Sequence, residues 1–175
     1  MPLFADYRPD VRGSVDARVL VRDAVVADVP GIVDVAATRS ALRAGFPGLV
    51  GTWVLDEART VLVAEADRAV MGWAMVDRWS GHDDAPDGCY VSALTVHPGR
   101  RRRGIGDRLL AGLMTWAWAR TTVLRSVVNA GNLPSVELHR RRGFREVARS
   151  ATFAGITFEG GTGVLLRADR PEAAA

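Results

Sequence analysis

The sequence has few of the features that mark secreted, membrane-bound or metal-stabilised proteins. It contains one cysteine, Cys89, so no intrachain disulfide can form and a structural zinc site built on cysteines is excluded. No apolar run reaches the roughly 20 residues of a membrane-spanning helix. Residues 1–14 lack the apolar centre of a signal peptide. We therefore expect a cytoplasmic protein with no membrane partner and no metal site.

An excess of charge of one sign is also missing. The net charge is +3 and the isoelectric point is near 9.9. This balance is too mild to require nucleic acid, but it suits an anionic ligand. The basic residues gather in two short runs, at 100–103 and 140–142. We expect no nucleic-acid partner; binding of nucleic acid through the first run would reveal itself by a strong dependence on salt.

Length and composition indicate one soluble domain. The chain has 175 residues, of which 48% are hydrophobic and 25% charged. Residues 1–14 carry Pro2, Pro9 and Gly13 without hydrophobic periodicity, and they predict a flexible N-terminal arm. Residues 15–168 form the expected domain, and residues 169–175 form a C-terminal tail.

Hydrophobic periodicity predicts alternating strands and helices. Asp28 is the expected N-cap of the first helix, residues 66–68 form a hairpin turn, and Gly143 is the expected left-handed C-cap. The predicted strands cover 17–22, 60–66, 69–78, 89–96, 123–129, 145–153 and 156–167. The predicted helices cover 28–39, 104–120 and 134–142, with short helical turns within 40–51 and 52–58. This order favours an α/β (α+β) fold with a mixed sheet of six to seven strands and helices on both faces.

A strand, a turn and a helix follow one another in the segment from Ser92 to Gly106. The first N–H groups of a helix have no partners within the helix, and the helix dipole makes that end partly positive. Gly104 and Gly106 let the backbone approach a ligand closely, and the preceding arginines add positive charge. These features favour a phosphate or pyrophosphate site. The alternative is a solvated run of arginines beside an ordinary helix start.

Two other phosphate-binding motifs do not fit. Gly99 and Gly104 have the spacing that opens a P-loop, but Ile105 and Gly106 stand where that motif needs Lys and Ser or Thr. The three glycines of a dinucleotide-binding motif are absent at their required spacing. The NTPase and dinucleotide-binding interpretations therefore fail, and the kind of anion that the turn would bind stays open.

At this turn the sequence resembles the GCN5-related N-acetyltransferase (GNAT) superfamily. The family motif is Arg/Gln-x-x-Gly-x-Gly/Ala after a strand that ends Val-x-Pro. Here Val96-His97-Pro98 precedes Arg101-Arg102-Arg103-Gly104-Ile105-Gly106. A second family element, an Asn-rich turn and a helix that closes in Gly-Phe, matches residues 129–144. The resemblance leans toward the phosphinothricin-type acetyltransferases, which carry Leu-His or Met-His in this helix.

The resemblance implies a V-splayed sheet that opens between the strand ending at Val96 and the strand ending at Asn129. Acetyl-CoA, the implied co-substrate, enters that gap. Backbone groups of Leu94 and Val96 would pair with its acetyl and pantetheine portions. The residues implied to bind the cofactor are Leu94, Thr95, Val96, Arg101, Arg102, Arg103, Gly104, Ile105, Gly106, Asn132 and Ser135.

The implied reaction is direct attack of a primary amine on the thioester, which needs a proton acceptor and a proton donor. His139 occupies the place where many family members have a tyrosine that protonates the leaving thiolate. The alternative is that His139 only packs against its surroundings. Ser92 stands where many members have a glutamate base, and serine is a poor base without a partner. A water relay to one of four carboxylates is the alternative base: Glu65, Asp83, Asp84 or Asp87.

The expected acceptor is a small-molecule primary amine. Loops 40–51 and 80–88 would border its cleft, Trp73 and Trp79 would form walls, and Arg39 or Arg43 would contact an acidic acceptor. Two alternatives remain open: a protein N-terminus or lysine as acceptor, and a non-catalytic acyl-CoA-binding module. The final strands could also support a homodimer.

Overall fold

The computed structural model describes residues 4, 7 and 14–172, so the arm predicted over 1–14 lies almost entirely outside the described residues. Seven strands form one sheet in the order β1-β2-β3-β4-β5-β9-β6. The strands of this sheet are β1 (Leu20–Asp23), β2 (Thr60–Ala66), β3 (Ala69–Trp79), β4 (Gly88–Val96), β5 (Val123–Asn129), β6 (Arg145–Ser150) and β9 (Gly163–Asp169). Short strands β7 (Thr152–Phe153) and β8 (Ile156–Thr157) pair separately.

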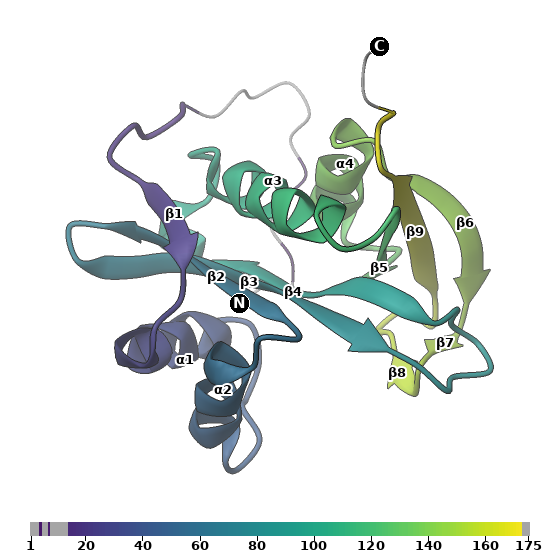
Figure 1. Cartoon of the computed structure of the whole chain (residues 1–175), viewed down its shortest axis with the longest axis horizontal. Coiled ribbons are helices and arrows are strands. Elements are labelled where there is room, and N and C mark those ends of the chain that lie inside the picture. Colours follow the sequence, from purple (N-terminus) through teal and green to yellow (C-terminus); the bar gives the residue numbers. More distant parts are fainter. Residues whose placement is uncertain (1–3, 5–6, 8–13, 173–175) are drawn as a thin grey trace.

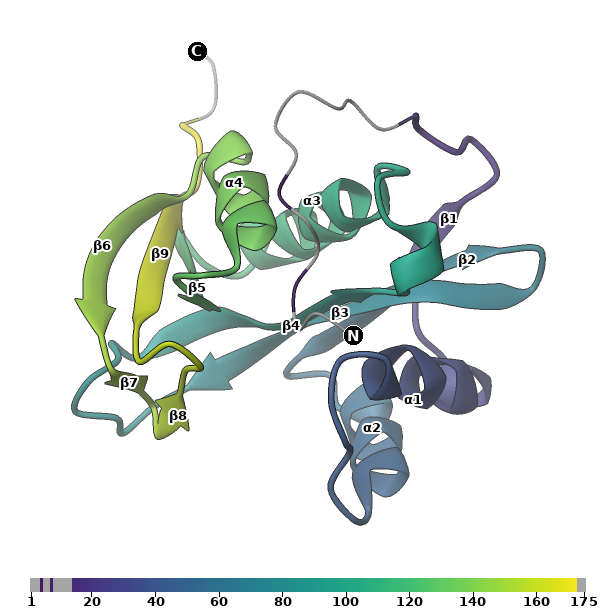
Figure 2. The same cartoon turned by 180° about the vertical axis from the view of Figure 1, so that it is seen from behind.

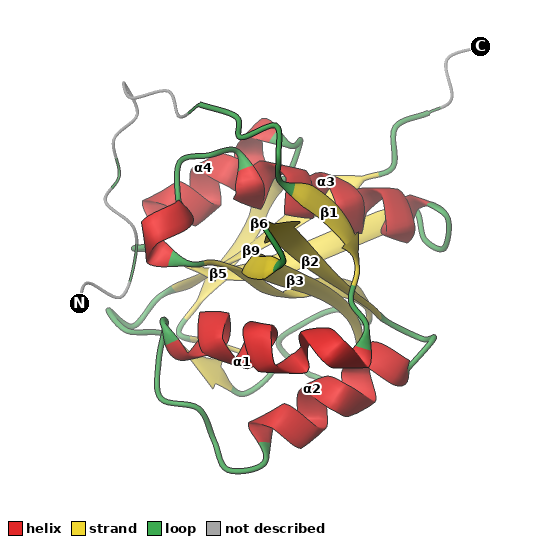
Figure 3. Ribbon diagram, turned by 90° about the vertical axis from the view of Figure 1, so that its left-hand side faces the viewer, coloured by secondary structure: helices red, strands yellow, loops and turns green. Residues whose placement is uncertain are grey.

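Helices cover both faces of the sheet, which confirms the predicted fold class. Helices α1 (Val29–Ala37) and α2 (Phe46–Leu55) lie on one face. Helices α3 (Ile105–Trp118) and α4 (Leu133–Arg141) lie on the other (Figures 1 and 3). Two 3-10 turns, η1 (Val26–Asp28) and η2 (Pro98–Arg100), precede α1 and α3. Among the described residues, no helix combines the length and apolarity needed to cross a membrane.

Each face has its own hydrophobic core. On the α3 side, Leu109, Leu110 and Leu113 are fully buried, because they recur at helical spacing on one side of the helix. On the α1–α2 side, Ile32 and Val50 are fully buried against the central strands. The two cores hold β2 and β3 between them, which explains why β2 is an almost continuous apolar run.

The sheet splits between β4 and β5, as the resemblance implied. These two strands are parallel and pair only over Cys89–Val91 and Leu124–Ser126. Beyond that point β4 remains paired to β3 as far as Val96, and β5 remains paired to β9 as far as Asn129. Figures 1 and 2 show β5, β9 and β6 turning steeply away from β2, β3 and β4.

A β-bulge lies at the start of the split. Met75 pairs with Ala93 and the next residue, Val76, pairs with Val91, so Ser92 has no partner on β3. A bulge bends its strand and redirects its side chains. The side chains of Ala93 and Ser92 consequently both contact residues on the α1–α2 side of the sheet.

Two predicted strand boundaries near the C-terminus are wrong. The strand predicted over 145–153 divides into β6 and β7, and the one over 156–167 divides into β8 and β9. Ala154 and Gly155 have φ values of 49° and 73° and form a tight turn, while Gly160 and Gly161 bend the chain again before β9. These bends bring the β7–β8 hairpin beside the sheet, where Phe153 joins a buried cluster with Tyr90 and Leu165.

Smaller corrections concern the N-terminal half. The first strand covers Leu20–Asp23 and not 17–22, and the short helix near 52–58 is the longer α2. Asp28 is at the N-cap position of α1, but its carboxylate makes no cap bond. It accepts hydrogen bonds from Arg22 instead, at 2.6 and 2.8 Å. The predicted capping role at α1 is therefore wrong, because the carboxylate is bound by Arg22 and by the amide of Val25, at 2.8 Å, ahead of η1.

The predicted hairpin and the predicted C-cap glycine are both confirmed. Asp67 and Arg68 have φ values of 52° and 63° between β2 and β3, and Gly143 has a φ of 85° just after α4. Edge strand β6 carries charged residues and a bulge between Glu146 and Ala148. Such features oppose edge-to-edge pairing, so the homodimer through the final strands stays a prediction.

Candidate functional site

The predicted pyrophosphate turn has the backbone shape of an anion cradle. It leaves β4 at Val96, passes through η2 and enters α3 at Ile105. Gly104, at the N-cap of α3, has a φ of 73°, and no side chain caps the helix there among the described residues. The first amides of α3 therefore lie open at the positive end of the helix dipole. Backbone N–H groups in this arrangement bind phosphate.

The two glycines of the motif differ in what they require. A Cβ atom added to Gly104 would lie 3.3 Å from a methyl group of Val15, and the positive φ also disfavours any other residue. A Cβ atom on Gly106 would lie 3.4 Å from Leu138, which is ordinary van der Waals contact. The structure thus favours glycine at 104 and tolerates alanine at 106.

The turn arginines are partly held by the protein. Arg101 donates from Nε to the carbonyl of Val96 at 3.4 Å. Arg103 pairs with the carboxylate of Asp16 at 3.6 Å, and its carbonyl accepts from the amide of Asp16. His97 accepts the amide of Gly99 through Nδ1 at 3.2 Å, which fits its position at the strand end.

The contact of Asp16 with the turn could not be predicted from the motif. Asp16 also accepts a hydrogen bond from Arg108 at its carbonyl, and Val15 covers Gly104. Side-chain hydrogen bonding to Arg18 lowers the pKa of the Asp16 carboxyl. The segment before β1 therefore supports the cradle from outside, although the two segments are far apart in the sequence.

Asn132 and Ser135 lie at the start of α4. The side-chain oxygen of Asn132 accepts the amide of Ser135 at 3.3 Å and caps the helix. The amide NH₂ group of Asn132 is not used by this cap. Contacts of either residue with the pantetheine arm stay predictions.

His139 is buried, with 1% of its surface exposed. Its Nδ1 lies 2.8 Å from the carbonyl oxygen of Ser135, and a carbonyl only accepts, so Nδ1 carries the proton. Nε2 is buried and has no partner among the described residues. Burial lowers the pKa of His139 to about 4, and the edge of the ring faces Phe144 at 5.0 Å between centroids. The resting imidazole is therefore neutral, with a free lone pair at Nε2.

Ser92, the bulged residue, has its hydroxyl bound on two sides. The Oγ atom accepts from the indole N–H of Trp79 at 3.1 Å and donates to the carbonyl of Tyr90 at 3.3 Å. Trp79 and Tyr90 stack with centroids 4.1 Å apart. Within the described chain no carboxylate bonds to Ser92, so nothing there increases the basicity of the hydroxyl.

Three of the four carboxylates proposed for a water relay are bound elsewhere. Glu65 pairs with Arg22 near the β1 edge. Asp84 accepts from the amide of Ala154 at 2.7 Å, and Asp87 accepts from the amide of Gly81 at 3.0 Å. These contacts anchor loops, and they argue for a structural role.

The α1–α2 face carries two polar groups that lack partners among the described residues. Trp73 is 5% exposed and its Nε1 is buried without an acceptor. Its ring meets Phe46 edge-on at 6.5 Å. The Arg39 residue is exposed to solvent overall, yet surrounding protein desolvates its guanidinium and lowers its pKa. Both groups are donors suited to an oxygen-bearing ligand.

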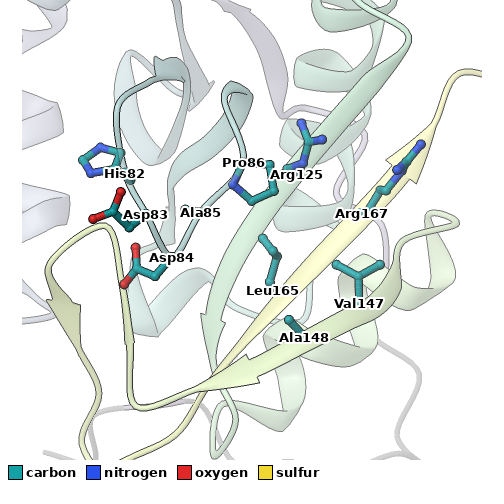
Figure 4. Close-up of a pocket in the computed structure, with 10 residues that line it drawn as sticks. All are labelled: His82, Asp83, Asp84, Ala85, Pro86, Arg125, Val147, Ala148, Leu165 and Arg167. Carbon is teal, nitrogen blue, oxygen red and sulfur yellow. The ribbon is translucent and has the colours of Figure 1, made fainter.

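A cavity of about 490 Å³ lies between the loop that follows β3 and the strands β5, β9 and β6 (Figure 4). Loop residues His82, Asp83 and Asp84 form one wall, and Arg125 and Arg167 project from β5 and β9 on the other. The predicted border loop 80–88 therefore does line a cavity. Loop 40–51, the other predicted border, does not contribute to it.

Comparisons with known proteins agree with this geometry. The sequence profile described as "Acetyltransferase (GNAT) family" matches residues 36–144, a range that contains both motifs. The chain is 32% identical over 136 residues to the L-methionine sulfoximine/L-methionine sulfone acetyltransferase of Pseudomonas aeruginosa. That match covers 71% of this chain and 78% of the relative.

Solved structures share the fold. The ribosomal-protein-alanine N-acetyltransferase of Brucella melitensis is 25% identical with a TM-score of 0.71, covering 86% of this chain and 99% of that chain. A GNAT superfamily phosphinothricin acetyltransferase from Sinorhizobium meliloti, in complex with AcCoA, is 20% identical with a TM-score of 0.71. It covers 87% of this chain and 89% of that chain.

Proposed function

Because the chain belongs to the acetyltransferase (GNAT) family and is an acetyl-CoA-dependent acetyltransferase, we propose that it acetylates the primary amine of a small, amino-acid-like molecule by direct attack. The observation that carries this proposal is the 32% identity to an acetyltransferase whose name specifies two amino-acid analogues as substrates. The acetyltransferase relatives also favour an enzyme over a non-catalytic acyl-CoA-binding module.

The residues of the turn fit the phosphates of acetyl-CoA. Open amides from Ile105 onward, the left-handed Gly104 and the arginines around it would hold the pyrophosphate. Acetyl-CoA, when bound, supplies an activated acyl group. The unpaired parts of β4 and β5 offer backbone groups on either side of the split, and those of Leu94 and Val96 would orient that group.

His139 is the residue we assign to proton transfer. Its Nε2 has a lone pair and no proton, so it cannot act as an acid from the resting state. We expect Nε2 to take a proton from the amine as the new C–N bond forms. It then releases that proton to the leaving sulfur as the C–S bond breaks. A pKa of about 4 favours this release but opposes the uptake, so bound substrates would have to raise the pKa of His139 for the relay to operate.

We assign Ser92 a role in positioning the backbone of β4. Its two hydrogen bonds hold the bulge of β4 in place through Trp79 and the carbonyl of Tyr90. A fixed bulge keeps the unpaired backbone of β4 turned toward the split, where an N–H group from this strand would polarise the acyl carbonyl.

The acceptor would approach from the α1–α2 face. Two donors on that face have no partner among the described residues, the indole of Trp73 and the guanidinium of Arg39, and they suit the carboxylate of an amino acid. The cavity between the 80–88 loop and Arg125 adds charges of both signs, which suit a zwitterion.

The direct test is release of free CoA thiol from acetyl-CoA over a panel of amines. Methionine sulfoximine, methionine sulfone and phosphinothricin should turn over fastest, and polyamines and aminoglycosides should not. The N-acetylated form of each active compound is the matched control, because it lacks the attacking amine. Measurable acetyl-CoA binding with no turnover on any amino acid would overturn the proposal.

A protein N-terminus is the second candidate acceptor. The structural similarity to the Brucella melitensis enzyme, at 25% identity, favours this candidate. A peptide that begins with alanine should therefore be part of the same panel, with mass spectrometry to locate the acetyl group. Faster acetylation of the peptide than of every amino acid would favour this second function.

A further inference from the structure

An ion pair connects the two helices that flank the cofactor site. Arg142, at the C-terminal end of α4, donates from Nε to one oxygen of Asp107 at 2.7 Å and from Nη2 to the other. Asp107 is the third residue of α3. The contact is bidentate, which is the strongest arrangement for arginine and carboxylate. Hydrogen bonding to Asp107 raises the pKa of Arg142.

The position of Asp107 creates a conflict with cofactor binding. A carboxylate in the first turn of a helix is attracted to the same open amides that bind phosphate. Asp107 directly follows Gly106, the last glycine of the motif, and its side chain is 45% exposed. An unpaired carboxylate at this position would compete with a pyrophosphate for the amides and repel it.

A second contact brings the same two helices together one turn away. Leu138 of α4 approaches Gly106, and a Cβ atom there would lie 3.4 Å from its methyl group. Leu138 and Arg142 are four residues apart and therefore share one face of α4. Arg142 thus reaches Asp107 from a helix that is already packed on the first turn of α3.

We propose that Arg142 is a positioning residue for the cofactor: it holds the Asp107 carboxylate away from the open amides of α3 and keeps α4 on the first turn of that helix. The phosphate site is then built from two helices, and its net charge depends on a residue that lies outside the glycine motif. This inference rests on the use of acetyl-CoA and not on the identity of the acceptor.

Other ion pairs of the chain provide a matched control. Arg149 and Glu146 also form a bidentate pair, at 2.6 and 2.8 Å, but they lie on exposed edge strand β6. Exposed pairs of this kind contribute little. The double variant Arg149→Leu with Glu146→Gln should leave cofactor binding unchanged.

The experiment measures dissociation constants of CoA by calorimetry for Arg142→Leu, Asp107→Asn and the double variant. Arg142→Leu should weaken CoA binding by roughly tenfold, because a bare carboxylate then faces the phosphates. Asp107→Asn should bind CoA at least as tightly as the unmodified protein. The double variant should return to within about twofold of the unmodified protein, because the repulsive charge is gone.

A second readout separates charge from structure. S-Acetylpantetheine carries the same thioester without the nucleotide, so its turnover should be unaffected by Arg142→Leu. Equal weakening of CoA binding by Asp107→Asn and Arg142→Leu would overturn the proposal in favour of a purely structural clamp. If Arg142→Leu loses as much turnover with S-acetylpantetheine as with acetyl-CoA, the proposal is also overturned. If Arg142→Leu does not fold, Asp107→Asn alone decides the question, since weaker CoA binding by that variant contradicts the proposal.

Discussion

The cofactor side and the acceptor side of the molecule are built in different ways. The proposed cofactor side consists of one turn and two helix starts, and the binding groups that we assign to it are mostly backbone amides between Val96 and Asp107. The proposed acceptor side collects side chains from the segment after α1, from β3, β5 and β9 and from the 80–88 loop, which are far apart in the sequence. Backbone sites depend on local conformation, whereas side-chain sites depend on how distant segments pack. Mutations on the two sides should therefore affect different kinetic constants.

The largest effect is expected at His139, which we place between the two sides. His139→Phe keeps the buried ring but removes Nε2, and general acid–base groups typically contribute roughly 100- to 10,000-fold to the rate. We expect kcat to fall by at least about 100-fold while the KM values of both substrates stay within about threefold. Steady-state kinetics with both substrates varied provides the measurement. An unchanged kcat would assign His139 to packing alone.

The same residue makes stability depend on pH. The folded-state pKa of His139, about 4, is below its ordinary value of 6.5, so the unfolded chain binds the proton first. Stability should decline as pH falls from about 6.5 to about 4 and then level off. The total loss from this group is about 3 kcal/mol.

Urea unfolding of the unmodified protein and of His139→Phe between about pH 7.5 and 4 isolates this contribution. The difference between the two curves should shrink or reverse toward low pH, because the phenyl ring of the variant cannot take up a proton. A constant difference over that range would show that His139 keeps an ordinary pKa in the folded protein.

On the cofactor side, Gly104→Val should weaken acetyl-CoA binding by roughly 30-fold, because a left-handed backbone costs a β-branched residue about 2 kcal/mol. The valine side chain would also press on Val15. Gly106→Ala is the matched control, and it should change binding by less than about threefold, since its Cβ has room. The KM of the amine should be unaffected in both variants. Similar losses at the two glycines would mean that helix packing, and not the left-handed turn, shapes the cradle.

The smallest effect is expected on the acceptor side. Trp79→Phe retains a ring for stacking on Tyr90 but removes the N–H that binds Ser92. The loss of one hydrogen bond of about 1 kcal/mol should lower kcat roughly fivefold, because the β4 backbone that would polarise the acyl carbonyl is then held less firmly. The KM of acetyl-CoA should not change. A change confined to acetyl-CoA would show that the bulge serves the cofactor side only.

Much of the fold follows from local patterns in the sequence. The sequence correctly predicts the strand over 123–129 and the amphipathic helix after Gly104, because their hydrophobic periodicity is strong. The final strands were misplaced because Gly155 and the Gly160–Gly161 pair each interrupt a segment whose composition alone resembles a continuous strand. The sequence predicts a cap at Asp28 because the chain reversal between β1 and η1, which brings Arg22 to this carboxylate, leaves no periodic signal.

The candidate site likewise has one part that the sequence predicts and another that it does not. The turn around Gly104 was predictable, because a glycine pattern between a strand and a helix specifies backbone conformation directly. The protonation state of His139 was not, since it depends on complete burial and on the carbonyl of Ser135. The support from Asp16 and the Arg142–Asp107 pair was also missed, because neither leaves a periodic or motif signal.

By itself, the sequence determined the order of the main elements, the shape of the turn between β4 and α3 and the family to which the chain belongs. These depend on residues that are close together along the chain, where backbone preferences and spacing suffice. Only the tertiary structure decided that His139 is neutral, that Ser92 lies on a bulge held by Trp79, and that Arg142 reaches Asp107. Each of these follows from burial or from a contact between distant segments, and none is encoded in a local pattern.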